Sequence, residues 1–280
     1  MIKFGPSGNS ENFYNAGKKT SEQSAVWVKE MGLDCFEYSF GRGVSLSDER
    51  ACEIGMAFND AGIEISVHAP YYINFANPDE EMIKKSNFYL LESIKKGKLM
   101  GAKRVVFHPA SQGKMERKEA VSLTKARIKD FTKLLLDTGD FGVNIYPETM
   151  GKLGQIGTVE EIAEFCLLSD IIIPAIDFGH VNAREGGLLK TQEDYYKILR
   201  FMISELGYEK MKNFHVHFSK IEYGQKGEIK HLTFEDNVYG PEFLPLVPVL
   251  KDLKLEPYVI CESNGTQDVD ALMMKKAFFG

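Results

Sequence analysis

Histidines and carboxylates in this chain stand where short apolar segments end. Histidine together with Asp and Glu, with no Cys nearby, is the ligand set of a catalytic zinc, manganese or iron centre. Each residue alone could instead cap a strand or form a hydrogen bond in the core, but the position shared by all six histidines favours one common site. The residues concerned are His68, His108, Glu148, Asp177, His180, His215, His217, His231 and Glu262.

Two of these segments end in the same way. His68 is followed two residues later by Pro70, and His108 is followed directly by Pro109. Proline ends a strand and fixes the turn behind it, so adjacent strands of this kind bring two imidazoles side by side. Such a pair needs a third ligand, and the next segment supplies Glu148, whose carboxylate can bridge two metal ions.

The later segments add further ligands. Asp177 and His180 lie three residues apart, whereas His215 and His217 are two residues apart and point to the same side of a strand. Glu262 follows the last apolar segment. An ordered series of ligand types on six successive strands predicts a multinuclear metal site.

Four of the candidates have other readings that the sequence leaves open. Asp177 could cap the turn that follows its strand, and His231 could be an exposed loop residue. His217 is expected to support a ligand, because one strand end rarely supplies two ligands to one cluster. Glu37 could be a carboxylate facing the site or could pair with a lysine.

A second set of residues could bind an anionic polymer. Arg42, Tyr71, Tyr72 and Phe75 are expected to form a rim that stacks on bases and binds phosphate, although aromatic residues there could equally pack against helix ends. Lys220 is expected to neutralise phosphate, unless it is solvated like most lysines.

Apolar segments and amphipathic stretches alternate along the whole chain, which predicts a parallel (β/α)₈ TIM barrel of class α/β. A doubly wound sheet is the alternative, but it would usually begin with a glycine-rich GxGxxG turn, which residues 4–10 lack. In a barrel, the loops after the strands meet at the C-terminal face, where active sites lie. The expected strands are 2–5, 35–39, 64–67, 104–107, 143–146, 172–176, 214–218 and 258–261. The expected helices are 21–31, 47–61, 80–100, 116–137, 159–168, 191–206, 242–253 and 268–275.

Composition sets further limits. The chain has 280 residues, 44% of them hydrophobic, and is expected to form a single domain over 1–280. Its formal net charge of −6 excludes a polycation that coats nucleic acid nonspecifically, but not a DNA substrate. The four cysteines lack metal-binding spacing, and neither a signal peptide nor a membrane span is evident, so a cytoplasmic protein without an obligate protein partner is expected.

In this order, the motifs GIEISVHAPYYINFANPD, AKRVVFHPAS, PETMG, DFGH, FHVHFSK and VICES resemble the endonuclease IV family of apurinic/apyrimidinic endonucleases, within the xylose isomerase-like barrels. The resemblance covers nearly the whole chain. It implies a three-zinc phosphodiesterase, with Mn²⁺ as another possible ion, that acts as a monomer on damaged double-stranded DNA.

The resemblance also implies ligand roles for individual residues. His68 and His108 would bind a first zinc ion, with Glu148 bridging to a second. The second ion would be completed by Asp177, His215 and Glu262. His180 would bind a third ion with ligands from the loop after the seventh strand.

The chain departs from the family pattern at the third site. Where the family has Asp-x-His, this chain has Glu228, two further residues and His231, so that Ile229 falls at the position of the family's Asp. The third metal is then held by His231 with Glu228 after a small shift, is bound more weakly, or is absent. The first strand lacks the family's Gly-x-His-x-Ser, and Glu37 is more typical of sugar isomerases.

The sequence therefore predicts a metal-dependent enzyme that cleaves DNA 5′ to abasic sites in base-excision repair. Glu148 would bridge the two ions that hold the attacking hydroxide, and Lys220 would stabilise the leaving oxygen if the third metal is missing. The alternative is a sugar isomerase or epimerase that uses one metal ion. A barrel that has lost its metals and its activity is a third, less favoured reading.

Overall fold

The computed structural model describes residues 1–139 and 142–280 as a barrel of parallel strands. Within these residues, two four-stranded parallel sheets, β2-β3-β4-β6 and β1-β12-β9-β8, form the wall. Short parallel bridges between Ser7 and Glu37 and between Glu148 and Ala175 join the sheets and close the barrel. The strands are β1 (Lys3–Pro6), β2 (Cys35–Ser39), β3 (Glu64–His68), β4 (Arg104–Phe107), β6 (Asn144–Pro147), β8 (Ala175–Asp177), β9 (His215–Phe218) and β12 (Tyr258–Cys261).

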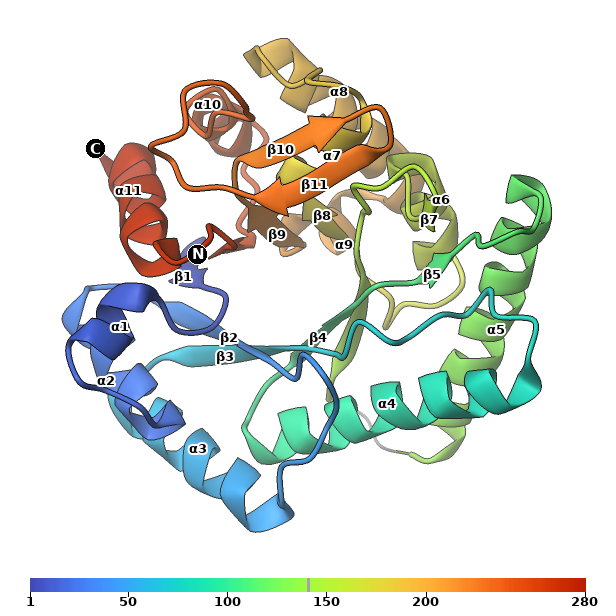
Figure 1. The fold of residues 1–280 in the computed structure, drawn as a ribbon, viewed down its shortest axis with the longest axis horizontal. Helices are drawn as coiled ribbons and strands as arrows, with labels where there is room; N and C mark the ends of the chain where they lie inside the picture. The colour runs from blue at the N-terminus through green and yellow to red at the C-terminus, as the bar shows by residue number, and fades with distance from the viewer. Residues whose placement is uncertain (140–141) are drawn as a thin grey trace.

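Helices surround these strands on the outside (Figure 1). Side chains cap the N-termini of several helices: the Ser47 hydroxyl accepts a hydrogen bond from the backbone N–H of Arg50, and Thr158 forms a capping box with Glu161. The predicted (β/α)₈ TIM barrel is thus confirmed. The surrounding helices are α2 (Ser21–Glu30), α3 (Asp48–Ala61), α4 (Glu80–Leu99), α5 (Arg117–Asp137), α6 (Val159–Cys166), α8 (Gln192–Leu206), α10 (Leu246–Asp252) and α11 (Gln267–Phe279).

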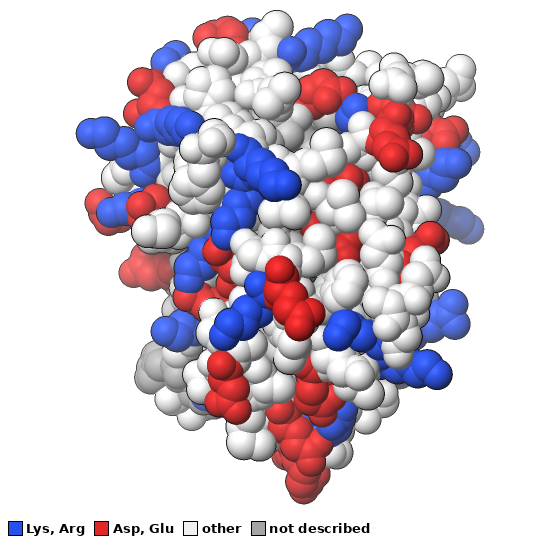
Figure 2. Space-filling model, turned by 90° about the vertical axis from the view of Figure 1, so that its left-hand side faces the viewer, with Lys and Arg blue, Asp and Glu red and all other residues white. Residues whose placement is uncertain are grey.

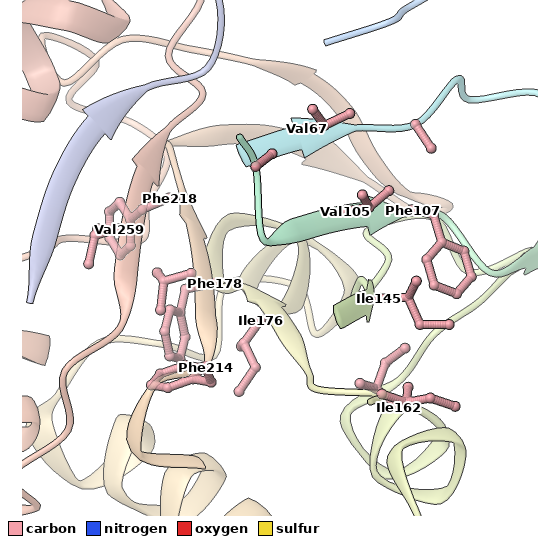
Figure 3. Close-up of a cluster of buried hydrophobic side chains, with 14 of the residues drawn as sticks. Val67, Val105, Phe107, Ile145, Ile162, Ile176, Phe178, Phe214, Phe218 and Val259 are labelled. Atoms are coloured by element: carbon pink, nitrogen blue, oxygen red, sulfur yellow. The ribbon is translucent and has the colours of Figure 1, made fainter. Parts of the chain in front are cut away.

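Alternation along the strands separates an apolar layer from a polar interior. Val67, Val105 and Ile145 lie level with one another on β3, β4 and β6, and Ile162 of α6 belongs to the same buried cluster (Figure 3). Apolar burial of this kind contributes roughly 25 cal/mol per Å² and holds the helices on the barrel. Residues at the alternate positions face inward, which is how the strands present histidines and carboxylates to one another.

Several elements between strands and helices were not predicted. No expected strand or helix covers residues 180–189 and 219–239, but these stretches include most of helix α7 (Phe178–Arg184) and the hairpin strands β10 (Ile221–Gly224) and β11 (Gly227–His231). The polar hairpin lacks the apolar runs on which the strand prediction relied. The other additions are α1 (Glu11–Asn15), the short pair β5 (Ala110–Ser111) and β7 (Gln155–Ile156), and α9 (Tyr208–Lys212).

The surface carries charges of both signs. Figure 2 shows one side of the molecule, on which Lys and Arg side chains lie among those of Asp and Glu. Among the described residues, no helix is long and apolar enough to cross a membrane.

Candidate metal centre

Glu148 lies at the middle of the predicted ligands. Its side chain is fully buried just beyond β6. Its Oε2 is 3.1 Å from Nε2 of both His68 and His108. Its Oε1 is 3.0 Å from Nδ1 of His217 and 3.3 Å from Nδ1 of His180. One carboxylate therefore faces four imidazoles from four different segments, as a bridging ligand requires.

A second group brings together Glu148, Asp177, His217 and Glu262, with potential ligand atoms within 4.8 Å of one another. The sequence prediction placed His215 in this group, but the structure places His217 there. The register of the strands explains the difference. His217 lies level with Asp177 on β8, whereas His215 lies level with Ala175, deeper in the barrel.

His215 lies instead beside Glu37, the carboxylate on β2. Its Nε2 is 3.1 Å from Oε2 of Glu37, and the other oxygen of Glu37 lies 2.8 Å from Nε2 of His217. All three side chains are fully buried. Glu37 therefore faces the inside of the barrel and contacts histidines, not a lysine.

A third group consists of His180, Glu228 and His231, again with ligand atoms within 4.8 Å. Residues three apart in a regular strand point to opposite faces. The pairing of β10 with β11 shifts register between Glu222 and Tyr223, which leaves Ile229 as an extra, bulged residue. This bulge returns Glu228 and His231 to the same group, so Ile229 does not replace the ligand.

The hairpin that carries this group is docked on the loop after β6. The backbone N–H of Glu228 donates to the carbonyl of Gly151, and that of Leu153 donates to the carbonyl of Lys226. A Cβ on Gly151 would lie 2.7 Å from Cβ of Glu228, so glycine is needed for this approach. The third group is thus assembled by two loops far apart in sequence.

Hydrogen bonds orient three of the histidines. Nδ1 of His68 is 2.8 Å from the Ala69 carbonyl, and Nδ1 of His180 is 3.0 Å from the Thr149 carbonyl. Nδ1 of His231 is 2.8 Å from the Ser219 hydroxyl. A proton on Nδ1 leaves the Nε2 lone pair of each ring free for a metal, an arrangement common among metal-binding histidines. Sequence reasoning did not identify the supporting carbonyls and hydroxyl.

Unpartnered buried atoms indicate that a cation fits here. Oδ1 of Asp177 accepts a hydrogen bond from the His180 backbone, while its Oδ2 is buried without a hydrogen-bond partner. Asp177 is thus both the cap of α7 and a member of the second group. This oxygen has only an ion-pair contact, at 3.3 Å from Nδ1 of His180. A buried carboxylate oxygen without a hydrogen-bond donor is costly, and a divalent cation among oxygen and imidazole ligands would satisfy it.

The pKa values reflect the concentrated charge. Burial would raise the pKa of Glu148, but the charges of His217 and His108 hold it well below its usual range. Burial, together with the charges of Glu148 and Glu262, raises the pKa of Asp177 although His180 opposes this. Carboxylates crowded in this way favour any bound cation.

A cleft of about 380 Å³ opens above these groups. Its wall includes the edges of His68, His108 and His231, and also Tyr71. Exposed Lys152 lines the cleft too, a residue that the sequence analysis missed although it lies in the loop directly after Glu148. A hollow of about 620 Å³ lies elsewhere, lined by residues of α3, by the C-terminal end of α4 and by the start of β4.

The predicted rim is present in part. Tyr71 and Tyr72 are about half exposed, and their rings lie with centroids 4.3 Å apart, tilted by 42° to each other. Arg42 is exposed in the turn after β2, close enough for its charge to act on Tyr72. The expectation for Phe75 was wrong: it is fully buried between Phe107 and Phe131.

Lys220 does not serve the site as predicted. Its side chain is buried, with Nζ 2.7 Å from the Glu242 carboxylate and 2.7 Å from the Asp236 carbonyl. A lysine held by these two oxygens stabilises the loop after β10 and β11, and it is not among the residues that line the cleft. We therefore assign no phosphate-binding role to Lys220.

Comparison with known proteins agrees with this architecture. The family model described as xylose isomerase-like TIM barrel matches residues 25–276. The chain belongs to this family. Among its relatives, an uncharacterized protein of Methanocaldococcus jannaschii is 32% identical over 90% of this chain and 89% of its own length. A probable endonuclease 4 of Staphylococcus aureus is 29% identical over 78% of this chain and 76% of its own.

Solved members of the fold include two kinds of enzyme. Endonuclease IV from Thermus thermophilus superposes with a TM-score of 0.69 at 20% identity, covering 99% of this chain and 98% of the other. D-psicose 3-epimerase from Clostridium cellulolyticum superposes equally well, with a TM-score of 0.69 at 15% identity and the same coverage. These likenesses establish the fold.

Proposed function

We propose that the protein is a metal-dependent phosphodiesterase that cleaves DNA on the 5′ side of abasic sites. The observation that carries this proposal is the number of ligand groups. The group of Glu148, Asp177, His217 and Glu262 would suffice for one ion. His68 and His108 on one side, and the group of His180, Glu228 and His231 on the other, extend it to a centre for two or three ions.

The residues of the centre have distinct tasks in such a reaction. Zinc or manganese ions held here would lower the pKa of a bound water and neutralise charge on the phosphate. Glu148 would hold neighbouring ions together through its two oxygens, each of which faces a different pair of histidines. The supporting groups on His68, His180 and His231 would keep the ligand rings fixed.

The rim of the cleft would bind the damaged strand. The adjacent, half-exposed rings of Tyr71 and Tyr72 offer an apolar surface for bases beside the lesion. Exposed Arg42 and Lys152 can contact phosphates. An abasic nucleotide is easily swung out of the duplex because it has no base pair to break. The cleft of about 380 Å³ would hold such a nucleotide. In this proposal, residues 1–280 act as a single domain.

A sugar epimerase or isomerase is the second candidate. The group of Glu148, Asp177, His217 and Glu262 can hold one ion against the oxygens of a sugar during proton transfer. The superposition on D-psicose 3-epimerase and the small cleft are compatible with this reaction. His68, His108 and His180 are additional ligand types for which a one-metal reaction has less use.

The test combines metal analysis with cleavage of a labelled duplex that contains one tetrahydrofuran abasic analogue. Two or three tightly bound ions per chain and a nick 5′ to the lesion are expected. An undamaged duplex of the same sequence is the control. One exchangeable ion without a nick, together with turnover of a ketose, would replace the nuclease assignment with the epimerase.

A further inference from the structure

Glu37 forms a buried polar cluster beneath the candidate metal centre. It is fully buried on β2, and its Oε2 accepts a hydrogen bond of 2.9 Å from the hydroxyl of Ser66 on β3. The same oxygen lies 3.1 Å from Nε2 of His215, and Oε1 lies 2.8 Å from Nε2 of His217. Glu37 is therefore within contact distance of three polar side chains, one of which also faces the centre.

The cluster could itself be regarded as a cation site. Several of its atoms, including Oε1 of Glu37 and Nε2 of His217, are buried without a partner in hydrogen-bond geometry. However, a neutral imidazole has a single lone pair, and Nδ1 of His217 already faces Glu148 and Glu262, so Nε2 is not available for a second ion. Direct contact between Glu37 and His217 therefore explains the geometry better than an ion between them.

The orientation of His217 leads to a specific role for Glu37. Nδ1 of His217 faces the centre, 3.0 Å from Oε1 of Glu148 and 3.6 Å from Oε2 of Glu262. A neutral imidazole has one lone pair and one N–H. If Nδ1 binds a metal ion, the proton must be on Nε2, where it meets the carboxylate of Glu37.

We propose that Glu37 is a positioning residue that fixes the ring and tautomer of His217 and thereby sets the metal affinity of the group Glu148, Asp177, His217 and Glu262. This inference rests on the metal centre proposed above. Its basis is the pattern seen at the other ligands. His68, His180 and His231 each have their second nitrogen engaged by a carbonyl or hydroxyl oxygen, and His217 has a charged carboxylate there. A carboxylate partner makes the imidazole a stronger donor to the metal.

Ser66 and His215 keep Glu37 in place. Both contact Oε2, which leaves Oε1 directed at His217. This role of His215 does not require it to bind metal. His215 lies level with Ala175, below the candidate ligands, and holds the carboxylate of Glu37 in place. The paired residues Glu37 and His215 would act together on His217.

The test measures zinc binding at buffered free-zinc concentrations for the wild-type protein, Glu37→Gln and Glu37→Leu. Glutamine keeps an oxygen acceptor but loses the charge, whereas leucine removes the contact. For one zinc equivalent, the free zinc concentration at half-occupancy should be about 10-fold higher than in the wild type for the glutamine variant, and about 100-fold higher for the leucine variant. The remaining equivalents should keep their affinity, and the visible spectrum of the Co²⁺ form should change.

Glu161→Gln is the matched control. Glu161 is also buried and paired, with Arg117, but it lies on α6 away from the ligands. Its substitution tests whether loss of a buried carboxylate weakens zinc binding merely by loosening the fold. The inference is overturned if Glu37→Gln binds zinc as tightly as the wild type, or if it loses one equivalent outright, since Glu37 would then be a ligand. Absence of zinc from the wild-type protein would instead defeat the proposed metal centre.

Discussion

Glu228 and His231 reach the same candidate metal group although two residues separate them on β11. A bulge at Ile229 reverses the alternation of side chains between them. The extra residue therefore accounts for the wider spacing in the sequence and lets both side chains reach the same candidate group. The three candidate ligands of the third group therefore lie together in this chain, with Glu228 in place of the aspartate of the family pattern.

Deletion of Ile229 should preserve the third metal. Without the bulge, Glu228 and His231 are two residues apart in a regular strand and still face the same side. Metal content is measured after dialysis against a dilute chelator. The deletion variant and the wild-type protein should retain the same number of ions per chain. His231→Ala should lose one ion per chain, while Lys230→Ala, a change of the exposed neighbour paired with Glu222, should lose none.

Two outcomes would contradict this account of the hairpin. If deletion of Ile229 lowers the metal content as much as His231→Ala, then the bulge is needed for ligation for another reason. If His231→Ala leaves the number of ions unchanged, then His231 is a loop residue and the third group does not hold a metal.

The metal-free protein should lose stability as pH rises from about 6.5 to about 9. Burial would lower the pKa of His68, but its bond to Glu148 and the charge of that carboxylate raise it from 6.5 to about 9. A raised pKa means that the folded state binds the proton more tightly than the unfolded state does. The contribution of protonated His68 to folding stability is therefore fully present below pH 6.5 and is lost as the pH passes through 9. The expected change in unfolding free energy is on the order of 1–3 kcal/mol.

Urea unfolding of the metal-free protein at a series of pH values measures this effect. His68→Gln should make the profile less steep in this window without flattening it, because the pKa values of His180 and His217 are also raised. Glu161→Gln should not change the shape of the profile there, because its carboxylate, with a pKa below its usual 4.5, titrates at lower pH. A profile of wild-type protein that is flat or rises between pH 6.5 and 9 would show that His68 is not held in its charged form by Glu148.

Replacement of Tyr71 by alanine should weaken DNA binding with little effect on the metal. Stacking of a base on an aromatic ring contributes about 1–3 kcal/mol, which corresponds to a rise in KM of about 5- to 150-fold. Tyr14→Ala is the control, since Tyr14 is similarly exposed but lies on α1, away from the cleft. An equal KM in Tyr71→Ala and wild type would remove the ring from the DNA-binding surface, and a lower metal content would assign it to the centre.

The sequence was sufficient to predict the barrel because its strands and helices repeat a local pattern. It also indicated that most of the candidate ligand residues would lie close together, since a residue at the end of a strand must lie at the barrel mouth. It selected His215 where the structure places His217, because period 2 puts both on one side and only the register against β8 shows which is level with Asp177. Lys220 was misassigned because its partner Glu242 lies 22 residues away in the sequence and meets it only through tertiary folding.

The role of Glu148 gives the most direct test of a centre with several ions. Glu148→Gln keeps the shape of the side chain but removes the charge that faces His68, His108, His180 and His217. Activity should fall by more than the roughly 10- to 100-fold typical of a residue that only supports a ligand, because both oxygens are expected to contact metal. Circular dichroism should show an intact fold, since Glu148 lies at the mouth of the barrel and not in its apolar layer. Near-normal turnover in a folded Glu148→Gln protein would exclude a bridging carboxylate. If Glu148→Gln does not fold, the activity of Asp177→Asn is measured instead, because that substitution alters the same centre and leaves Glu148 in place.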